Sequence, residues 1–314
     1  MARRYHRAAA PTPWQHRPVP SFTDRLSDLP FLGLGISTEY GAHDGDGALD
    51  LRALQAAAPE LAAFLEVGVE VEKGLDAHAA AWVSEGLPAT YHFLDVNLDE
   101  PEDLDAHWLD RVRSLAAEVK PAWMCGDAGL WHFGPREPAH MLLLPPILTD
   151  DAAGELAEGI VALREATGLE VLPENPPGAV YVGDLHLLDF FARVCDRADT
   201  GLLLDAAHLA IYQRVAGHDP LAGLDGFPLD RVVEMHVAGG VVREHDGYPF
   251  VDDAHGLDVL PDTWAVLDAV APRAPELRAV VFEAERNPLG GVIDGLRALA
   301  QRLDGTPFGA KRAS

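Results

Sequence analysis

Carboxylate and imidazole side chains recur along this sequence, each at or just beyond the end of a short apolar run. The ordered series is His92, Glu174, Asp205, His208, His236, Asp253, His255 and Glu283. Glutamate, aspartate and histidine together are a typical ligand set for zinc, manganese or iron, and they bind these metals without a thiolate. Because carboxylates gathered in one buried place are costly unless a cation offsets their charge, the series predicts a metal centre.

Two short spacings within the series strengthen this prediction. Asp205-x-x-His208 places two ligand types within reach of one metal where the chain leaves a strand. Asp253-x-His255 places two side chains on the same side of an extended segment, because side chains alternate along a strand. Each residue alone has a plainer interpretation, since a histidine in a strand is usually a hydrogen-bonded core residue and an aspartate after an apolar run is often a helix N-cap. The metal prediction therefore depends on the whole series.

Eight apolar runs that alternate with amphipathic segments would position these residues. The predicted strands are residues 31–37, 64–70, 89–96, 122–128, 169–175, 201–207, 231–239 and 278–285. The clearest predicted helices are residues 104–119, 150–166, 184–198, 262–270 and 289–303, with Thr149 and Asp150 as N-terminal caps of the second. Near-continuous apolar runs are typical of parallel strands buried on both faces. The pattern predicts an α/β fold, a (βα)₈ TIM barrel, whose strand ends meet at one mouth and bring the series together.

The chain is expected to form one domain. No linker or internal repeat interrupts residues 30–305, which we interpret as a single metal-binding barrel. Residues 1–29 are interpreted as a Pro-rich N-terminal tail and residues 306–314 as a C-terminal tail. Residues 240–256 would form a long loop for this fold, and long loops are often functional.

Length, charge and cysteine content restrict the class of protein. The chain has 314 residues, of which 48% are hydrophobic and 24% charged, as is usual for a globular protein. Its net charge of −26 argues against nucleic-acid binding, because phosphate backbones would be repelled. No apolar run approaches the roughly 20 residues of a membrane span, and no signal peptide is predicted. Two cysteines, Cys125 and Cys195, suit a reducing cytoplasm, where we expect the protein to act.

The ordered series resembles that of the xylose-isomerase-like barrel superfamily. The finer resemblance is to the DUF692 family, the multinuclear non-haem iron-dependent oxidases (MNIOs). The motifs that carry it are LLPPILT (143–149), PENPP (173–177), LLLDAAH (202–208), RVVEMHVAGG (231–240), DAH (253–255) and VFEAE (281–285). The resemblance implies that His92, Glu174, Asp205, His236, Asp253, His255 and Glu283 bind metal. His208 stands where the oxidases usually have Asn.

One departure from the family pattern bears on the number of metal ions. The GDAGL segment (126–130) has Ala128 at the position of a ligand histidine, and His132 is the candidate replacement. Gly240 also stands where the family has a further histidine. We therefore expect two iron ions and no well-made third site, with manganese or zinc as the other possible metals. The site next to His92 is expected to be empty or only partly filled.

The resemblance implies oxidative chemistry on a ribosomally made precursor peptide (RiPP biosynthesis). Its members use O2 to modify cysteine, or less often another residue, and commonly act beside a small partner protein that holds the peptide leader. In residues 240–256 we expect Arg243, His245 and Tyr248 to contact substrate. The sequence assigns no catalytic residue.

Three other functions are weighed against this one. A divalent-metal sugar isomerase or epimerase on the same barrel would need a lysine or a second carboxylate positioned for proton transfer, and Lys73 and Lys120 are poorly placed for it. An apurinic endonuclease is disfavoured by the net charge and by Ala128. A barrel without enzymatic activity is disfavoured by the nearly complete ligand series.

Overall fold

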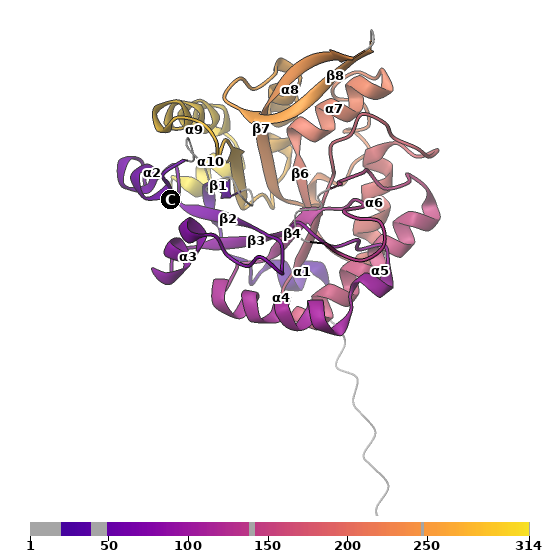
Figure 1. Cartoon of the computed structure of the whole chain (residues 1–314). Helices are drawn as coiled ribbons and strands as arrows, with labels where there is room; N and C mark the ends of the chain where they lie inside the picture. Colours follow the sequence, from indigo (N-terminus) through magenta and orange to yellow (C-terminus); the bar gives the residue numbers. More distant parts are fainter. Residues whose placement is uncertain (1–19, 39–48, 138–141, 246–247, 314) are drawn as a thin grey trace, which may run out of the picture.

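The computed structural model describes residues 20–38, 49–137, 142–245 and 248–313. In this part of the chain, eight parallel strands close into a barrel (Figure 1). They are β1 (Gly33–Thr38), β2 (Phe64–Val69), β3 (Ala89–Phe93), β4 (Met124–Asp127), β5 (Val171–Glu174), β6 (Leu202–Asp205), β7 (Val232–His245) and β9 (Ala279–Glu283). The barrel closes because β1 pairs with β2 on one side and with β9 on the other. The predicted TIM barrel is confirmed.

The helices lie outside the strands. They are α2 (Leu51–Ala57), α3 (Ala77–Ser84), α4 (Ala106–Val119), α5 (Asp150–Thr167), α6 (Leu187–Ala198), α7 (Ala206–Ala216), α8 (Pro261–Val270) and α9 (Leu289–Leu303), with short 3₁₀ turns at Pro101–Asp103, Leu229–Arg231 and Ala271–Arg273. Thr149 is the N-cap of α5, and its hydroxyl accepts a hydrogen bond from the Ala152 amide. Asp150 is the first helical residue rather than a second cap. No helix in the described ranges is both long and apolar enough to cross a membrane.

The predicted long loop at residues 240–256 is wrong. Strand β7 continues past the barrel to His245, and β8 (Tyr248–Gly256) returns beside it in an antiparallel hairpin. The β8 arm packs against helix α7. Val251 of β8 lies beside Ala210 and Ile211 of α7. The hairpin therefore holds Asp253 and His255 on a paired strand.

Parts of both predicted tails are also ordered elements of the domain. Helix α1 (Phe22–Leu26) begins with a capping box in which Ser21 and Asp24 bond each other's backbone amides. Its buried Phe22 and Leu26 belong to the apolar cluster that closes the N-terminal end of the barrel. Helix α10 (Pro307–Arg312) buries Phe308. The predicted tail at 1–29 is thus too long at its C-terminal end, and residues 1–19 lie outside the described part.

A buried ion pair attaches α1 to the barrel. Arg25 Nε lies 2.7 Å from Glu170 Oε2, and the Glu170 side chain is only 2% exposed. Replacing Arg25 with alanine leaves that carboxylate buried without its main partner, so the free energy of unfolding should fall by about 3 kcal/mol. Urea denaturation measures this difference. Arg297→Ala, which breaks an exposed pair with Asp294, is the matched control and should cost less than about 0.5 kcal/mol. Equal losses in the two variants would contradict the structural role of Arg25.

Candidate metal centre

The predicted ligands meet at the mouth of the barrel. Strands β3, β5, β6, β7 and β9 contribute His92, Glu174, Asp205, His236 and Glu283, helix α7 contributes His208, and β8 contributes Asp253 and His255. They converge because parallel strands of a closed barrel end on the same side. Asp205 also caps α7, so it accepts from the His208 amide. Asp205 can therefore act both as a helix N-cap and as a metal ligand.

Glu174 lies at the centre of the group. Its Oε2 is 2.8 Å from His92 Nε2, while its Oε1 is 3.2 Å from His236 Nδ1 and 3.5 Å from His208 Nδ1. The two oxygens of this buried carboxylate thus face different imidazoles. That is the geometry of a residue that can bridge two ions.

Five groups of possible ligands occur among the described residues, and in each the ligand atoms lie within 4.8 Å of one another. One group is Glu66–Cys125–Glu234. The other four contain the predicted ligands and are His92–Asp127–Glu174, Glu174–Asp205–His208, Glu66–His236–Glu283 and His255–Glu283–Glu285. Such separations suit atoms that share one ion with bonds of about 2 Å. Glu174 and Glu283 each belong to two groups. The mouth can therefore hold a multinuclear centre.

Unpartnered buried atoms fit the same interpretation. Six polar atoms at the mouth are buried without a hydrogen-bond partner among the described residues: Asp127 Oδ1, Glu174 Oε1, Asp205 Oδ2, His236 Nδ1, Asp253 Oδ1 and Glu283 Oε2. Buried polar atoms are nearly always satisfied in folded proteins. All six are oxygen or nitrogen donors of the kind that iron, manganese and zinc accept. The residues present thus fit a bound metal.

Buried carboxylates at the mouth raise the pKa values of the imidazoles beside them, and the negative charge of these carboxylates favours bound cations. Burial lowers the pKa of His92, but Glu66 and Glu174 outweigh it and raise the pKa to about 9. The pKa values of His208, His236 and His255 are raised in the same way. Burial lowers each of them, but the neighbouring carboxylates raise them by more. Burial raises the pKa of Asp205 to about 7. Without a metal, the histidines and Asp205 therefore keep protons that offset the negative charge of the carboxylates. A bound divalent ion would displace these protons.

Three residues outside the predicted ligand set belong to the centre. Glu66 of β2 lies 3.1 Å from His236 Nε2. Asp127 ends β4 beside His92 and Glu174. Glu285 accepts a hydrogen bond from His255 Nδ1 at 3.0 Å, and its other oxygen accepts one from the Ser37 hydroxyl. The signal for all three was a carboxylate in or next to an apolar strand.

Ala128 does not face the centre. It lies against Leu98, Pro146 and Leu156 on the helix side of the barrel, and the preceding Asp127 points to the mouth instead. His132 does not replace it, because its Nε2 is 3.1 Å from Asp103 Oδ2 and its Nδ1 bonds the Gly134 carbonyl. Asp127, rather than a histidine, is therefore the third possible ligand beside His92 and Glu174. The expected low metal occupancy next to His92 stays a prediction.

Because Ala128 does not face the centre, a histidine at position 128 should not add a metal ligand. Ala128→His should leave the bound metal count unchanged and lower the free energy of unfolding by about 2 kcal/mol, because the ring must enter packed core. Metal analysis and urea denaturation of the same samples measure both effects. His132→Ala, the control, should also keep its full metal count. A higher metal count in Ala128→His would show that residue 128 can reach the centre.

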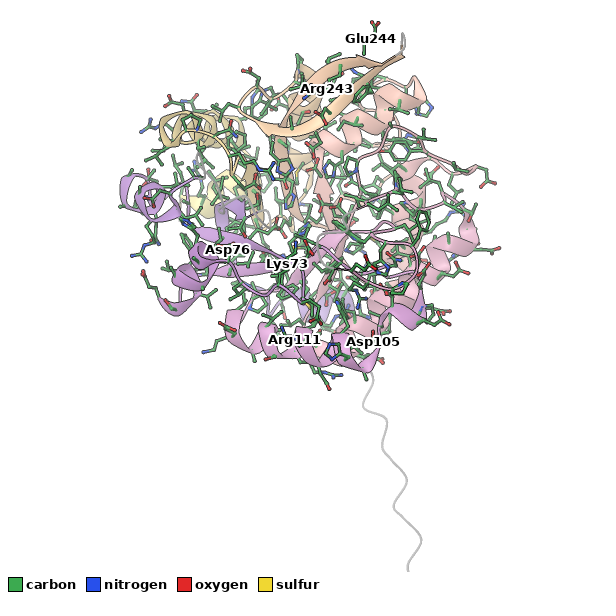
Figure 2. All side chains as sticks on the ribbon, viewed as in Figure 1. Lys73, Asp76, Asp105, Arg111, Arg243 and Glu244 are labelled. Carbon is green, nitrogen blue, oxygen red and sulfur yellow. The ribbon has the colours of Figure 1, made fainter. Side chains whose placement is uncertain are left out.

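An open cavity of about 610 Å³ lies at the mouth, and eight of the possible ligands line it: Glu66, His92, Asp127, His208, Asp253, His255, Glu283 and Glu285. The Phe250–Asp253 part of β8 also lines the cavity, as do Leu142, Leu143 and residues 177–179. Of the predicted substrate-contacting residues, Arg243 lies out on the hairpin, as Figure 2 shows, with its Nε 2.6 Å from Asp252 Oδ2. His245 and Tyr248 form the last pair of the hairpin, and their side chains lie outside the described part. The substrate role of these three residues remains a prediction.

Comparison with known families decides the affiliation. A family model described as "RiPP precursor modification enzyme MbnB/TglH/ChrH" matches residues 50–291. The chain belongs to this family. The predicted resemblance to DUF692 is thereby confirmed, and a precursor peptide is the substrate class of the family. Curated relatives include a UPF0276 protein of Rhizorhabdus wittichii, 29% identical over 85% of this chain and 92% of its own length. A UPF0276 protein of Anaeromyxobacter sp. is 26% identical over 70% of this chain and 76% of its own length.

Solved structures support the fold of this family member. A sugar phosphate isomerase/epimerase from Parabacteroides distasonis superposes with a TM-score of 0.54 at 14% identity, over 92% of this chain and 99% of that chain. A xylose isomerase-like TIM barrel protein from Mycobacterium smegmatis, in complex with magnesium, gives 0.54 at 11% identity, over 90% and 99%. At these identities the likeness concerns the barrel alone. It confirms the xylose-isomerase-like architecture.

Proposed function

We propose that this protein is an iron-dependent oxidase that uses O2 to modify a cysteine of a ribosomally made precursor peptide. The observation that carries the proposal is the set of overlapping ligand groups at an open cavity, in a chain of a peptide-modifying family. Both cysteines of the chain are free and buried, which fits the cytoplasm as the proposed place of action.

The first two proposed iron sites share Glu174. One would use His92, Asp127 and Glu174, and a second Glu174, Asp205 and His208. His255, Glu283 and Glu285 could hold a third. Bound iron would supply the one-electron and O2 chemistry that protein side chains lack.

Neighbouring groups orient these ligands. His208 Nδ1 lies 2.9 Å from the Asn175 carbonyl, which directs Nε2 toward Asp253 Oδ2 at 2.9 Å. The Asn175 side chain also exchanges two hydrogen bonds with the Asp205 backbone, at 3.0 and 2.9 Å. Partners of this kind fix the ring and its tautomer, and their loss typically lowers metal affinity about 10–100-fold. Asn175 therefore holds two ligands of the second site in place.

The rim of the mouth suits macromolecular partners. Phe133, Val180 and Val182, on the loops after β4 and β5, are 72%, 69% and 61% exposed. Val180 directly follows the cavity-lining residues 177–179, and exposed apolar side chains beside a cavity favour an interaction surface. We propose that the peptide, and a small leader-binding protein that presents it, contact this rim.

The sugar isomerase alternative finds less support. Lys73 Nζ is 2.6 Å from Glu70 Oε1, and neither Lys73 nor Lys120 lines the cavity. The centre thus lacks a lysine positioned for proton transfer. The similarity to epimerases is at the level of fold.

Reconstitution with different metals tests the proposed function. The protein is loaded without oxygen with iron(II), manganese(II) or zinc(II), and then incubated with O2 and candidate cysteine-containing precursor peptides taken from the neighbouring open reading frames. Mass spectrometry should show modified peptide only with iron and O2. Modification that proceeds equally with zinc or without O2 would overturn the oxidase proposal, and interconversion of ketoses and aldoses would favour the isomerase.

A further inference from the structure

Strand β8 has a free edge. It pairs with β7 along residues 248–256, and no other strand of the described ranges pairs with it. Figure 1 shows the β7–β8 hairpin standing out from the barrel above α7 and α8. A strand edge of this kind offers a row of N–H and C=O groups to an extended peptide.

The register identifies the backbone groups at this edge. His245 pairs with Tyr248 across two residues, so hydrogen-bonded pairs should recur at Arg243–Phe250 and Val241–Asp252. The intervening residues of β8, Pro249, Val251 and Asp253, then direct their backbone groups outward. Pro249 has no backbone N–H, which fits a position whose backbone groups point outward. It therefore marks the end of the edge that can pair with a peptide on the turn side. The free edge thus runs from Val251 toward Asp253.

This edge borders the cavity above the metal centre. Phe250, Val251, Asp252 and Asp253 line the cavity, together with Leu143 and Gly178. Asp253 Oδ2 is 2.9 Å from His208 Nε2, so the edge reaches the ligands themselves. An added strand would lie about 4.8 Å from β8, inside the cavity, and alternate side chains would point to the metal centre.

We propose that the precursor peptide binds as an additional β-strand along the free edge of β8, from Val251 to Asp253. The proposal rests on the proposed function, because it takes a peptide as substrate. Backbone hydrogen bonds to Val251 hold the peptide irrespective of sequence. The side chain to be modified lies opposite Asp253, facing the metal centre. Recognition of this kind selects for an extended segment rather than for a particular residue order.

Random linear peptides displayed on mRNA provide a probe that needs no known substrate. They are selected on the full chain loaded anaerobically with iron(II), and those whose binding depends on the metal are kept. Affinities are then measured for wild type, Val251→Pro and Val242→Pro. Val242 pairs with Val251, and its N–H is directed outward at the opposite edge, so Val242→Pro is the matched control. Each selected peptide is also made with single backbone N-methyl groups.

Strand addition predicts two results. Val251→Pro should weaken binding about tenfold through one lost hydrogen bond, while Val242→Pro binds like wild type. N-methylation should weaken binding to wild type at every second peptide residue only. Equal affinities of the two variants, N-methyl effects without this alternation, or a selection that enriches no peptide would each overturn the proposal. The mass change of the precursor with iron and O2 tests the proposed function separately.

Discussion

Replacing Glu174 with glutamine should lower the number of metal ions bound per chain by two. The carboxylate belongs to both the His92–Asp127 and the Asp205–His208 groups, so the neutral amide weakens two sites at once. Glutamine keeps the size of the side chain, and the fold should therefore persist. Metal analysis of fully loaded protein measures the effect, with circular dichroism to check the fold.

Two single-site variants calibrate this expectation. Asp127→Asn and His208→Gln each affect one of the two groups, so each should lower the count by one ion. If Glu174→Gln also loses only one ion, the residue is a terminal ligand of one site. An unchanged count would place the metal centre elsewhere.

Metal affinity should rise with pH up to about 9. The pKa of His92 is raised to about 9 in the metal-free protein, so its imidazole carries a proton at neutral pH that the metal must displace. Below this pKa, each displaced proton makes the affinity fall about tenfold for every pH unit of acidification. Above it the His92 contribution to the slope is lost.

Titration with metal at several pH values, with a pH indicator to count released protons, measures this dependence. His92→Gln removes one displaced proton and should reduce the slope of log affinity against pH by about one below pH 9. An affinity independent of pH between 6 and 9, or a variant with the wild-type slope, would contradict the assigned protonation.

The barrel could be predicted because its strands are strongly apolar and buried on both faces. Val67 and Val280, for example, are fully buried, and near-continuous apolar runs are typical of parallel strands that are covered on both faces. The convergence of His92, Glu174 and His236 followed from the topology, since parallel strands of a barrel end at one mouth. No contact between these residues had to be known.

The sequence contains local signals for the β7–β8 hairpin and for helix α1, but the polar or proline-rich composition around them favours a loop or a tail. Asp246-Gly247 is a dipeptide typical of a two-residue hairpin turn, yet it lies in a stretch rich in polar residues. Helix α1 was obscured by the prolines around it, although Ser21 and Asp24 have capping-box spacing.

The direction of side chains at the end of β4 could not be predicted from sequence. Asp127 and Ala128 are adjacent, and strand alternation sends one to the mouth and the other to the helices. Which of them faces the mouth depends on the register between β4 and β5, where Asp127 pairs with Glu174. A shift of one residue would exchange their roles.

The apolar cluster at the N-terminal end of the barrel restricts how a peptide can enter and leave the cavity. Phe22, Phe64 and Trp123 are buried at the N-terminal end of the barrel, so a peptide cannot pass through it. Entry and departure must use the same opening, and each product must leave before the next peptide arrives. Since neither end of the peptide is threaded, the chain on both sides of the modified residue can be of any length. Internal positions of a long precursor are then as accessible as its termini.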